Sequence, residues 1–186
     1  MQIIIMRHAK VLIKKRNIYA NEIKSVVEEY DQTVIDNNVD NLDELKKVVD
    51  EVDFFVSSGL RRSVDSLALL GKEANYINKL FAEVKDPHFS RKFIKLPLYT
   101  WIAISKLLWR FGYSGGNLSY RKSREEAFEA SKLLIKFAKE QGSVLLLGHG
   151  MKNRLIVKAL KKQGWSERKK LSMKNWGYGV YEYPFG

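Results

Sequence analysis

Ile3-Ile4-Ile5-Met6-Arg7-His8-Ala9, at the start of the chain, is a hydrophobic run followed at once by an arginine and a histidine. Val144-Leu145-Leu146-Leu147-Gly148-His149-Gly150 has a similar arrangement near the other end. Short apolar runs that end in polar or glycine residues are typical of buried parallel strands. In open α/β sheets, ligands bind beyond the carboxyl ends of such strands. We therefore expect His8 and His149 to meet in one crevice.

A third hydrophobic run, Phe54-Phe55-Val56, is followed by Ser57-Ser58-Gly59 and then by Arg61-Arg62. The arginine fork binds phosphate oxygens bidentately and stays charged. The arginine pair falls at the expected start of a helix, where positive charge opposes the helix dipole, and this indicates a compensating anion. Histidines and arginines that converge at strand ends predict a site for a phosphorylated substrate.

The remaining pattern alternates strands with helices. Strands are expected at 2–6, 53–57, 143–147 and 178–183, with a short strand-like segment at 78–84. Helices are expected at 22–30 with Asn21 as N-cap, 42–49, about 60–71, 98–111, 123–142 and 151–162. Ser123 and Glu126 are spaced as a capping box. This order predicts a three-layer α/β sandwich with a mainly parallel central sheet flanked by helices.

The domain prediction is a single domain over 1–186, with 85–122 as an insertion above the strand ends. Within that insertion, the aromatic segment 98–113 is most simply a helix packed on the body. A lid or pocket wall, or a helix that binds a membrane surface or a partner, are the alternatives. The sequence does not indicate an oligomeric state.

Composition limits the classes of protein. The chain has no cysteine, which excludes disulfides, thiolate catalysis and cysteine-based zinc sites and fits a reducing compartment. No apolar run approaches the roughly 20 residues that span a bilayer. The first residues lack the basic region and cleavage site of a signal peptide, so the cytoplasm is the predicted location.

The formal net charge is +12, carried largely by scattered lysines. No basic stretch stands out with interleaved aromatic residues, so a solvated lysine-rich surface is favoured over nucleic-acid binding. A basic background still attracts small phosphorylated substrates. No cluster of histidine and carboxylate residues has the spacing of metal ligands, and no metal or other cofactor is expected.

The chemistry of these residues suits phosphoryl transfer. A neutral imidazole such as His8 is a good nucleophile toward phosphorus when one ring nitrogen is free and the other is held by a hydrogen bond. Phosphoryl transfer otherwise requires positioning and positive donors around the non-bridging oxygens. Arg7, Arg62 and His149 are the candidate donors. Backbone amides at the start of the helix after 53–57 add to them.

The three motifs resemble those of the histidine phosphatase superfamily, also called phosphoglycerate mutase-like. Met6-Arg7-His8-Ala9-Lys10, Ser57-Ser58-Gly59-Leu60-Arg61-Arg62-Ser63 and Leu147-Gly148-His149-Gly150 occur in the family's order. The resemblance spans essentially the whole chain and implies the family's fold. It also implies that His8 is phosphorylated, and that Arg7, Arg62 (rather than Arg61) and His149 complete the phosphate pocket.

The chain departs from the family pattern at three positions. Ala9 stands where glycine is usual, Gly59 where proline is usual, and Ser63 where alanine is usual. None of these changes removes a functional group, so the resemblance still implies an intact pocket. Lys10, Ser58 and Gly150 flank its motifs, and we expect them to contact the substrate.

The family also uses a carboxylate as general acid toward the leaving group. Glu83, in Leu80-Phe81-Ala82-Glu83, is our choice because similar members have a Phe-x-Glu there. Asp86 is the alternative, and His88 is expected to be a loop histidine.

Together these features predict an enzyme, a phosphoric monoester hydrolase with a phosphohistidine intermediate on His8. A phosphohistidine or phosphoprotein phosphatase is an alternative, because compact members share this form of the first motif. A mutase is disfavoured by the short chain. A protein that binds a phosphorylated ligand without turnover is the alternative from another class.

Overall fold

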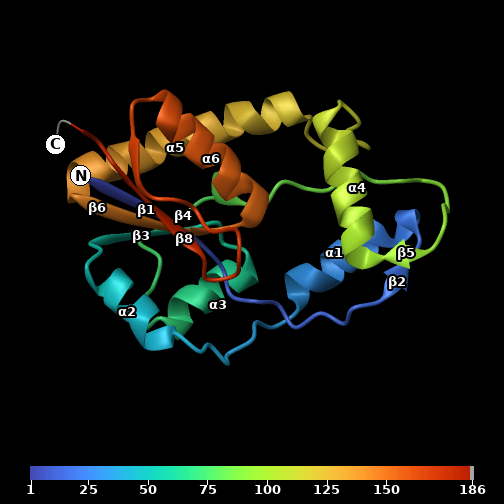
Figure 1. The fold of residues 1–186 in the computed structure, drawn as a ribbon, viewed down its shortest axis with the longest axis horizontal. Helices are drawn as coiled ribbons and strands as arrows, with labels where there is room; N and C mark the ends of the chain where they lie inside the picture. Colours follow the sequence, from blue (N-terminus) through green and yellow to red (C-terminus); the bar gives the residue numbers. More distant parts are fainter. Residues whose placement is uncertain (185–186) are drawn as a thin grey trace.

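The computed structural model describes residues 1–184, and a six-stranded sheet lies at its centre (Figure 1). The strands in spatial order are β4 (Tyr76–Ile77), β3 (Phe54–Ser57), β6 (Ser143–Gly148), β1 (Gln2–Arg7), β8 (Tyr178–Glu182) and β7 (Ser166–Lys169). The first four of these are parallel, and β8 is antiparallel to both of its neighbours. The prediction of a mainly parallel sheet is confirmed.

Helices cover both faces of this sheet (Figure 1). They are α2 (Leu42–Asp50) and α3 (Arg61–Leu69) on one face and α5 (Tyr120–Gln141) and α6 (Gly150–Lys162) on the other, whereas α1 (Ile23–Gln32) and α4 (Leu98–Arg110) lie at one end of the sheet. On one face, Ile3, Ile5, Val144 and Leu146 pack in a core with α5 and α6. On the other, Ile4, Met6, Leu145 and Leu147 pack in a core with α2 and α3. Because alternate residues of β1 and β6 enter two different cores, both strands are apolar throughout.

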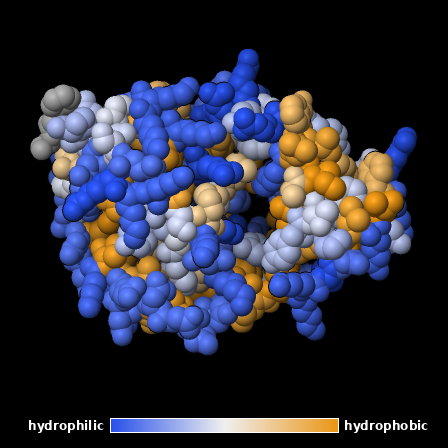
Figure 2. Space-filling model, in the orientation of Figure 1, coloured by the Kyte–Doolittle hydropathy of each residue, from blue (hydrophilic) through white to orange (hydrophobic). Residues whose placement is uncertain are grey.

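A smaller cluster lies at one end of the sheet. There β2 (Asn17–Ile18) pairs antiparallel with β5 (Leu96–Pro97), and α1 and α4 pack beside them (Figure 1). The core of this cluster includes Ile23 of α1 and Leu98 and Trp101 of α4. We call these four elements the cap. Figure 2 shows a hollow between the cap and the sheet.

Several local predictions were wrong. The strand expected at 78–84 lies at β4 instead, because Asn78 accepts a hydrogen bond from the Leu80 amide and begins a 3₁₀ turn, Lys79–Phe81. The capping box at Ser123 does not exist: α5 starts earlier, and Ser119 caps it by accepting from the Lys122 amide. Asn21 is not an N-cap, since it lies inside the 3₁₀ turn Ala20–Glu22 that precedes α1.

No helix among residues 1–184 is long and apolar enough to cross a membrane.

Candidate active site

The three motifs meet at the carboxyl ends of β1, β3 and β6. Arg7 lies opposite Gly148 in the β1–β6 pair, and Ser57 lies opposite Leu147 in the β3–β6 pair. Each strand therefore ends beside the next, and the residue after each strand enters the same crevice. The rings of His8 and His149 are 5.2 Å apart between centroids. Both side chains are almost fully buried.

The His8 ring is held in one tautomer. Its Nδ1 lies 2.6 Å from the carbonyl oxygen of Ala9. A carbonyl oxygen can only accept a hydrogen bond, so Nδ1 carries the proton and Nε2 keeps its lone pair. Asn175 Nδ2 donates to the backbone oxygens of both His8 and Ala9, at 3.0 and 3.1 Å, and fixes the loop that positions the ring. This is the state that a nucleophilic imidazole requires.

The surroundings of His8 keep it neutral. The pKa of His8 is lowered to about 3, chiefly by burial and then by the neighbouring His149, Arg62 and Arg7 in that order. The hydrogen bond to the Ala9 carbonyl opposes this shift. The imidazole is therefore neutral, with a proton on Nδ1 alone, throughout the physiological range.

The pH dependence of the free energy of unfolding should reveal this neutral state. A histidine in the unfolded chain has a pKa of about 6.5. Below that pH the unfolded chain binds a proton that buried His8 in the folded chain does not bind. The free energy of unfolding therefore falls by about 1.4 kcal/mol for each pH unit by which the pH is lowered. Burial also lowers the pKa of His149 well below its ordinary value, so it adds to the slope. In urea titrations between pH 4 and 6.5, we expect His8→Asn to have a slope shallower by about 1.4 kcal/mol per pH unit. Equal slopes for variant and wild type would contradict a neutral buried His8.

His149 is fixed from both sides. Arg62 Nε donates to its Nδ1 at 3.3 Å, so Nε2 carries the proton and donates to Ser58 Oγ at 2.7 Å. Its backbone amide donates to Asn153 Oδ1 at 3.1 Å. A bound phosphate oxygen could replace Ser58 Oγ as the acceptor of the hydrogen bond from His149 Nε2–H. Ser58, expected to contact substrate, therefore lies directly on the pocket.

Two arginines supply positive charge to the pocket. Arg62, at the start of α3, forms an ion pair with Asp31, and its guanidinium lies 5.0 Å from the centroid of the Tyr30 ring. Arg7 donates from Nη1 to the carbonyl oxygen of Met173 at 2.5 Å. The Nε of Arg7 is buried and has no hydrogen-bond partner in residues 1–184. An unsatisfied buried donor of this kind is a position that an anion would fill.

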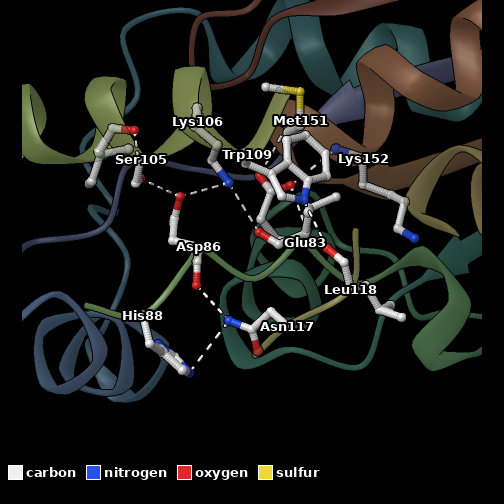
Figure 3. Close-up of polar contacts among 12 residues, drawn as sticks. Glu83, Asp86, His88, Ser105, Lys106, Trp109, Asn117, Leu118, Met151 and Lys152 are labelled. Atoms are coloured by element: carbon white, nitrogen blue, oxygen red, sulfur yellow. Dashed lines mark hydrogen bonds and ion pairs between the residues drawn. The ribbon is translucent and has the colours of Figure 1, made fainter. Parts of the chain in front are cut away.

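Glu83 lies at the amino end of α6. Its Oε2 accepts from the Met151 amide at 3.1 Å, and its Oε1 accepts from the amides of Lys152 and Val84 at 3.0 and 2.9 Å (Figure 3). A methyl group added to Gly150 would lie 3.7 Å from Glu83 Oε2 and equally near the Arg7 guanidinium. The carboxylate and the arginine therefore approach the same glycine, directly after His149.

Asp86 faces away from this arrangement, toward α4 (Figure 3). Its Oδ1 forms an ion pair with Lys106 at 3.0 Å and accepts from Ser105 Oγ at 3.1 Å. His88 lies further along the same segment, where Asn117 Nδ2 is 3.4 Å from its Nε2. These contacts tie residues 86–88 to the cap and to the loop before α5. They favour Glu83 over Asp86 as the carboxylate of the pocket.

The remaining expected residues differ in their placement. Gly150 is buried as the first residue of α6. Lys10 is exposed and pairs with Asp36 at 3.2 Å, so its contact with a substrate stays a prediction. Gly59 has a φ of +78°, a left-handed backbone that proline cannot adopt, which gives a local reason for glycine at this position.

Two residues of the pocket were missed in the sequence. Tyr30 and Asp31 lie in the last turn of α1, and they contact Arg62 from the cap side. The Tyr30 ring also lies 6.4 Å from the His8 ring, edge on, and burial raises the pKa of its hydroxyl. Nothing in the sequence distinguishes Asp31 from the other acidic residues of that helix.

Among residues 1–184, no group of three or more histidine, cysteine, aspartate or glutamate side chains could hold a metal ion. The site instead presents a tautomer-locked histidine, two arginines, a second histidine and a carboxylate. Such a set can bind a phosphate dianion and offers both a nucleophile and a proton donor to it.

No protein-family model and no curated protein matches this sequence. Solved structures do match. The Rv3214 protein of Mycobacterium tuberculosis is 16% identical with a TM-score of 0.64, covering 100% of this chain and 92% of its own. A mutant phosphoserine phosphatase of Entamoeba histolytica, in complex with phosphoserine, is 12% identical with a TM-score of 0.60 and the same two coverages. That phosphatase is also known with 3-phosphoglyceric acid.

The mycobacterial glucosyl-3-phosphoglycerate phosphatase Rv2419c is 17% identical with a TM-score of 0.55 and covers 87% of this chain and 82% of its own. At such low identities, these likenesses show the fold. The chain has the phosphoglycerate mutase-like α/β fold, as the sequence predicted.

Proposed function

We propose that this chain is a phosphatase that hydrolyses a phosphomonoester through a phosphohistidine on His8, without a metal ion. The observation that supports it most directly is the locked tautomer. His8 Nδ1 donates to the Ala9 carbonyl, and the unprotonated Nε2 is left within a pocket of Arg7, Arg62 and His149. A buried neutral imidazole among cationic donors has little structural use, but it is what in-line attack on phosphorus requires.

In the first step, the lone pair of His8 Nε2 forms a bond to phosphorus while the bond from phosphorus to the ester oxygen breaks. Arg7, Arg62 and the Nε2–H of His149 stabilise the charge on the three non-bridging oxygens. Glu83, protonated for this step, gives its proton to the departing oxygen. The alcohol leaves, and the phosphoryl group remains on His8.

In the second step, water attacks the phosphorus of the phosphohistidine. Glu83, now a carboxylate, takes a proton from that water, and the bond from phosphorus to Nε2 breaks. Inorganic phosphate leaves, and His8 returns to its neutral form. Each group ends the cycle in its starting state, so a single carboxylate and a single imidazole suffice for turnover.

The substrate we propose is a small phosphorylated metabolite. The cap stands beside the site, and a hollow separates it from the sheet (Figure 2), which suits a small ligand better than a protein surface. Phosphoserine and 3-phosphoglyceric acid, ligands of a phosphatase with this fold, are of that size. The cytoplasm, the location predicted from the sequence, would supply such compounds.

The test is to trap the intermediate. Protein incubated with a ³²P-labelled aryl phosphate in the presence of a chelator is quenched in alkali, in which a phosphohistidine survives, and then exposed to acid, in which it is lost. We expect acid-labile label on a peptide that contains His8. Hydrolysis without covalent label, or hydrolysis that stops when metal is removed, would overturn the proposal.

Glu83→Gln separates the two candidate acids. Because glutamine cannot donate or accept this proton, we expect kcat to fall by about 10²–10³-fold for an alkyl phosphate. The fall should be smaller for p-nitrophenyl phosphate, whose leaving group needs little protonation. Asp86→Asn, an equally conservative change three residues away, is expected to stay within about threefold, since its effects would pass only through the cap. A larger loss in Asp86→Asn than in Glu83→Gln would transfer the role to Asp86.

A further inference from the structure

Residues 87–124 form a stretch without a single aspartate or glutamate. The same stretch contains the cations Arg91, Lys92, Lys95, Lys106, Arg110, Arg121, Lys122 and Arg124. The chain as a whole is basic, and the stretches 1–21 and 141–166 also lack carboxylates, but 87–124 is the longest acid-free stretch. Of these cations, Lys106 and Arg110 lie on α4 of the cap. Lys106 pairs with Asp86 and Arg121 with Glu125, carboxylates that lie just outside the stretch.

An exposed apolar surface lies within this acid-free stretch. The exposed fractions are 81% for Phe111, 56% for Leu107, 51% for Phe93, 42% for Tyr113 and 38% for Leu108. We call these five residues the α4 patch. Figure 2 shows hydrophobic residues gathered over the region where Figure 1 places α4.

Basic residues line pockets beside side chains of the α4 patch and form its basic rim. Phe93, Leu108 and Tyr113 line one pocket of about 270 Å³ together with Arg91. A neighbouring pocket of about 470 Å³ is lined by Leu107 together with Arg110, Arg154 and Lys158. Large exposed apolar surfaces rimmed by polar groups are typical of interaction sites.

The outward position of these side chains is built into the cap. The opposite side of α4, including Trp101 and Trp109, is buried. Trp101 Nε1 donates to the Ile18 carbonyl at 3.0 Å, and Trp109 Nε1 donates to the Leu118 carbonyl at 2.8 Å. Tyr113 is tethered through its hydroxyl to the His88 carbonyl at 2.7 Å. With α4 fixed in this rotation, Leu107 and Phe111 cannot turn into the core.

We propose that the α4 patch docks the protein on the surface of an anionic lipid bilayer. Aromatic and aliphatic side chains that enter the interface, with lysine and arginine around them, are the chemistry that such a surface binds. Each cation near an anionic leaflet adds attraction, and no carboxylate of 87–124 opposes it. The protein would lie on the membrane and not cross it.

The same charges argue against other occupants. A second copy of this chain, paired through the same patch, would bring Arg91 and Arg110 of both copies together. Nucleic acid would match the cations and could stack on the exposed aromatic side chains, but it would leave the aliphatic Leu107 and Leu108 without an apolar partner. An anionic bilayer satisfies both the apolar centre and the basic rim. The proposal does not rest on the chemistry at His8.

Co-sedimentation with vesicles tests it. Full-length protein at about 0.15 M salt, where exposed charges are screened beyond about 8 Å, is mixed with phosphatidylcholine vesicles or with vesicles that contain phosphatidylglycerol. We expect binding to the anionic vesicles only. Leu107→Ser combined with Phe111→Ser should lower the partition coefficient at least about tenfold. Leu12→Ser, at a leucine that is 50% exposed outside the patch, is the matched control and should bind like wild type.

Thermal unfolding and hydrolysis of a soluble aryl phosphate show that the variants fold, and neither should change. Absence of binding to anionic vesicles would overturn the proposal. Equal binding by wild type and the double variant would also overturn it, because the binding would then come from unspecific charge attraction alone. Dimerisation of the free protein that the double variant abolishes would also overturn it, by assigning the patch to a second copy. Loss of binding in Leu12→Ser would overturn the proposal as well, because Leu12 lies outside the α4 patch.

Discussion

His8→Ala is expected to lower kcat/KM for p-nitrophenyl phosphate by about 10⁴-fold or more, the largest effect of any single change in this chain. The variant loses the Nε2 lone pair, which no other group in the pocket can replace. His149 has its Nδ1 lone pair occupied by Arg62 and its Nε2 protonated toward Ser58. The two-step route is therefore closed, and only direct attack by water on a bound phosphate remains.

The control is the third histidine. His88 lies beyond Asp86, in contact with Asn117 and away from the pocket, so His88→Ala should retain activity within about twofold. Steady-state rates on both variants give the comparison. Phosphate should still raise the melting temperature of His8→Ala, since Arg7, Arg62 and His149 remain.

Three outcomes would refute this mechanism. Equal losses in His8→Ala and His88→Ala would indicate a general effect on folding instead of a missing nucleophile. Full activity in His8→Ala would place the chemistry elsewhere. If wild type and both variants lack turnover but bind phosphate, the chain is a binding protein that keeps the pocket.

The strands that carry the site were predictable because of how they are buried. Runs such as Ile3-Ile4-Ile5 and Leu145-Leu146-Leu147 supply two cores at once, so their composition alone identifies them. The edge strand β7 could not be found in this way. Its residues, Ser-Glu-Arg-Lys, are all exposed. It pairs with β8 through its backbone, and backbone pairing does not require a hydrophobic pattern in the sequence.

The site was predictable where function and strand end coincide. His8, Arg7 and His149 follow strands directly, and Arg62 starts the next helix. Tyr30 and Asp31 were not predictable, because they reach Arg62 only through the way in which α1 packs beside α3. The resemblance favoured Glu83 over Asp86, but their positions, three residues apart in an irregular segment, did not separate them. In the structure their partners distinguish them, the α6 amides for Glu83 and Lys106 for Asp86.

Gly148→Ala is expected to destabilise the protein by about 3 kcal/mol or more. The added methyl carbon would lie 2.2 Å from Asn153 Oδ1, far inside contact distance. Asn153 cannot retreat without loss, because its Oδ1 accepts from the His149 amide and its Nδ2 donates to the Met6 carbonyl, both in the buried interior. The substitution thus breaks the connection between β1, β6 and α6 that positions His149.

Gly150→Ala is the matched control, two residues along. Its methyl carbon would meet its nearest neighbours, atoms of Arg7 and Glu83, at 3.7 Å, an ordinary contact. Urea unfolding should therefore change by no more than about 0.5 kcal/mol. If the two variants are equally destabilised, the cost comes from the loss of glycine as such and not from Asn153.

A double-mutant cycle identifies the cause of the Gly148→Ala loss. Asn153→Ala alone removes the two buried hydrogen bonds and should cost about 2–3 kcal/mol. In that background the clash is gone, so adding Gly148→Ala should cost less than about 1 kcal/mol, and the two changes should be strongly non-additive. Additive costs would show that the methyl group clashes with something other than Asn153. In that case the tight approach at the end of β6, and with it the reason that glycine precedes His149, would need another explanation.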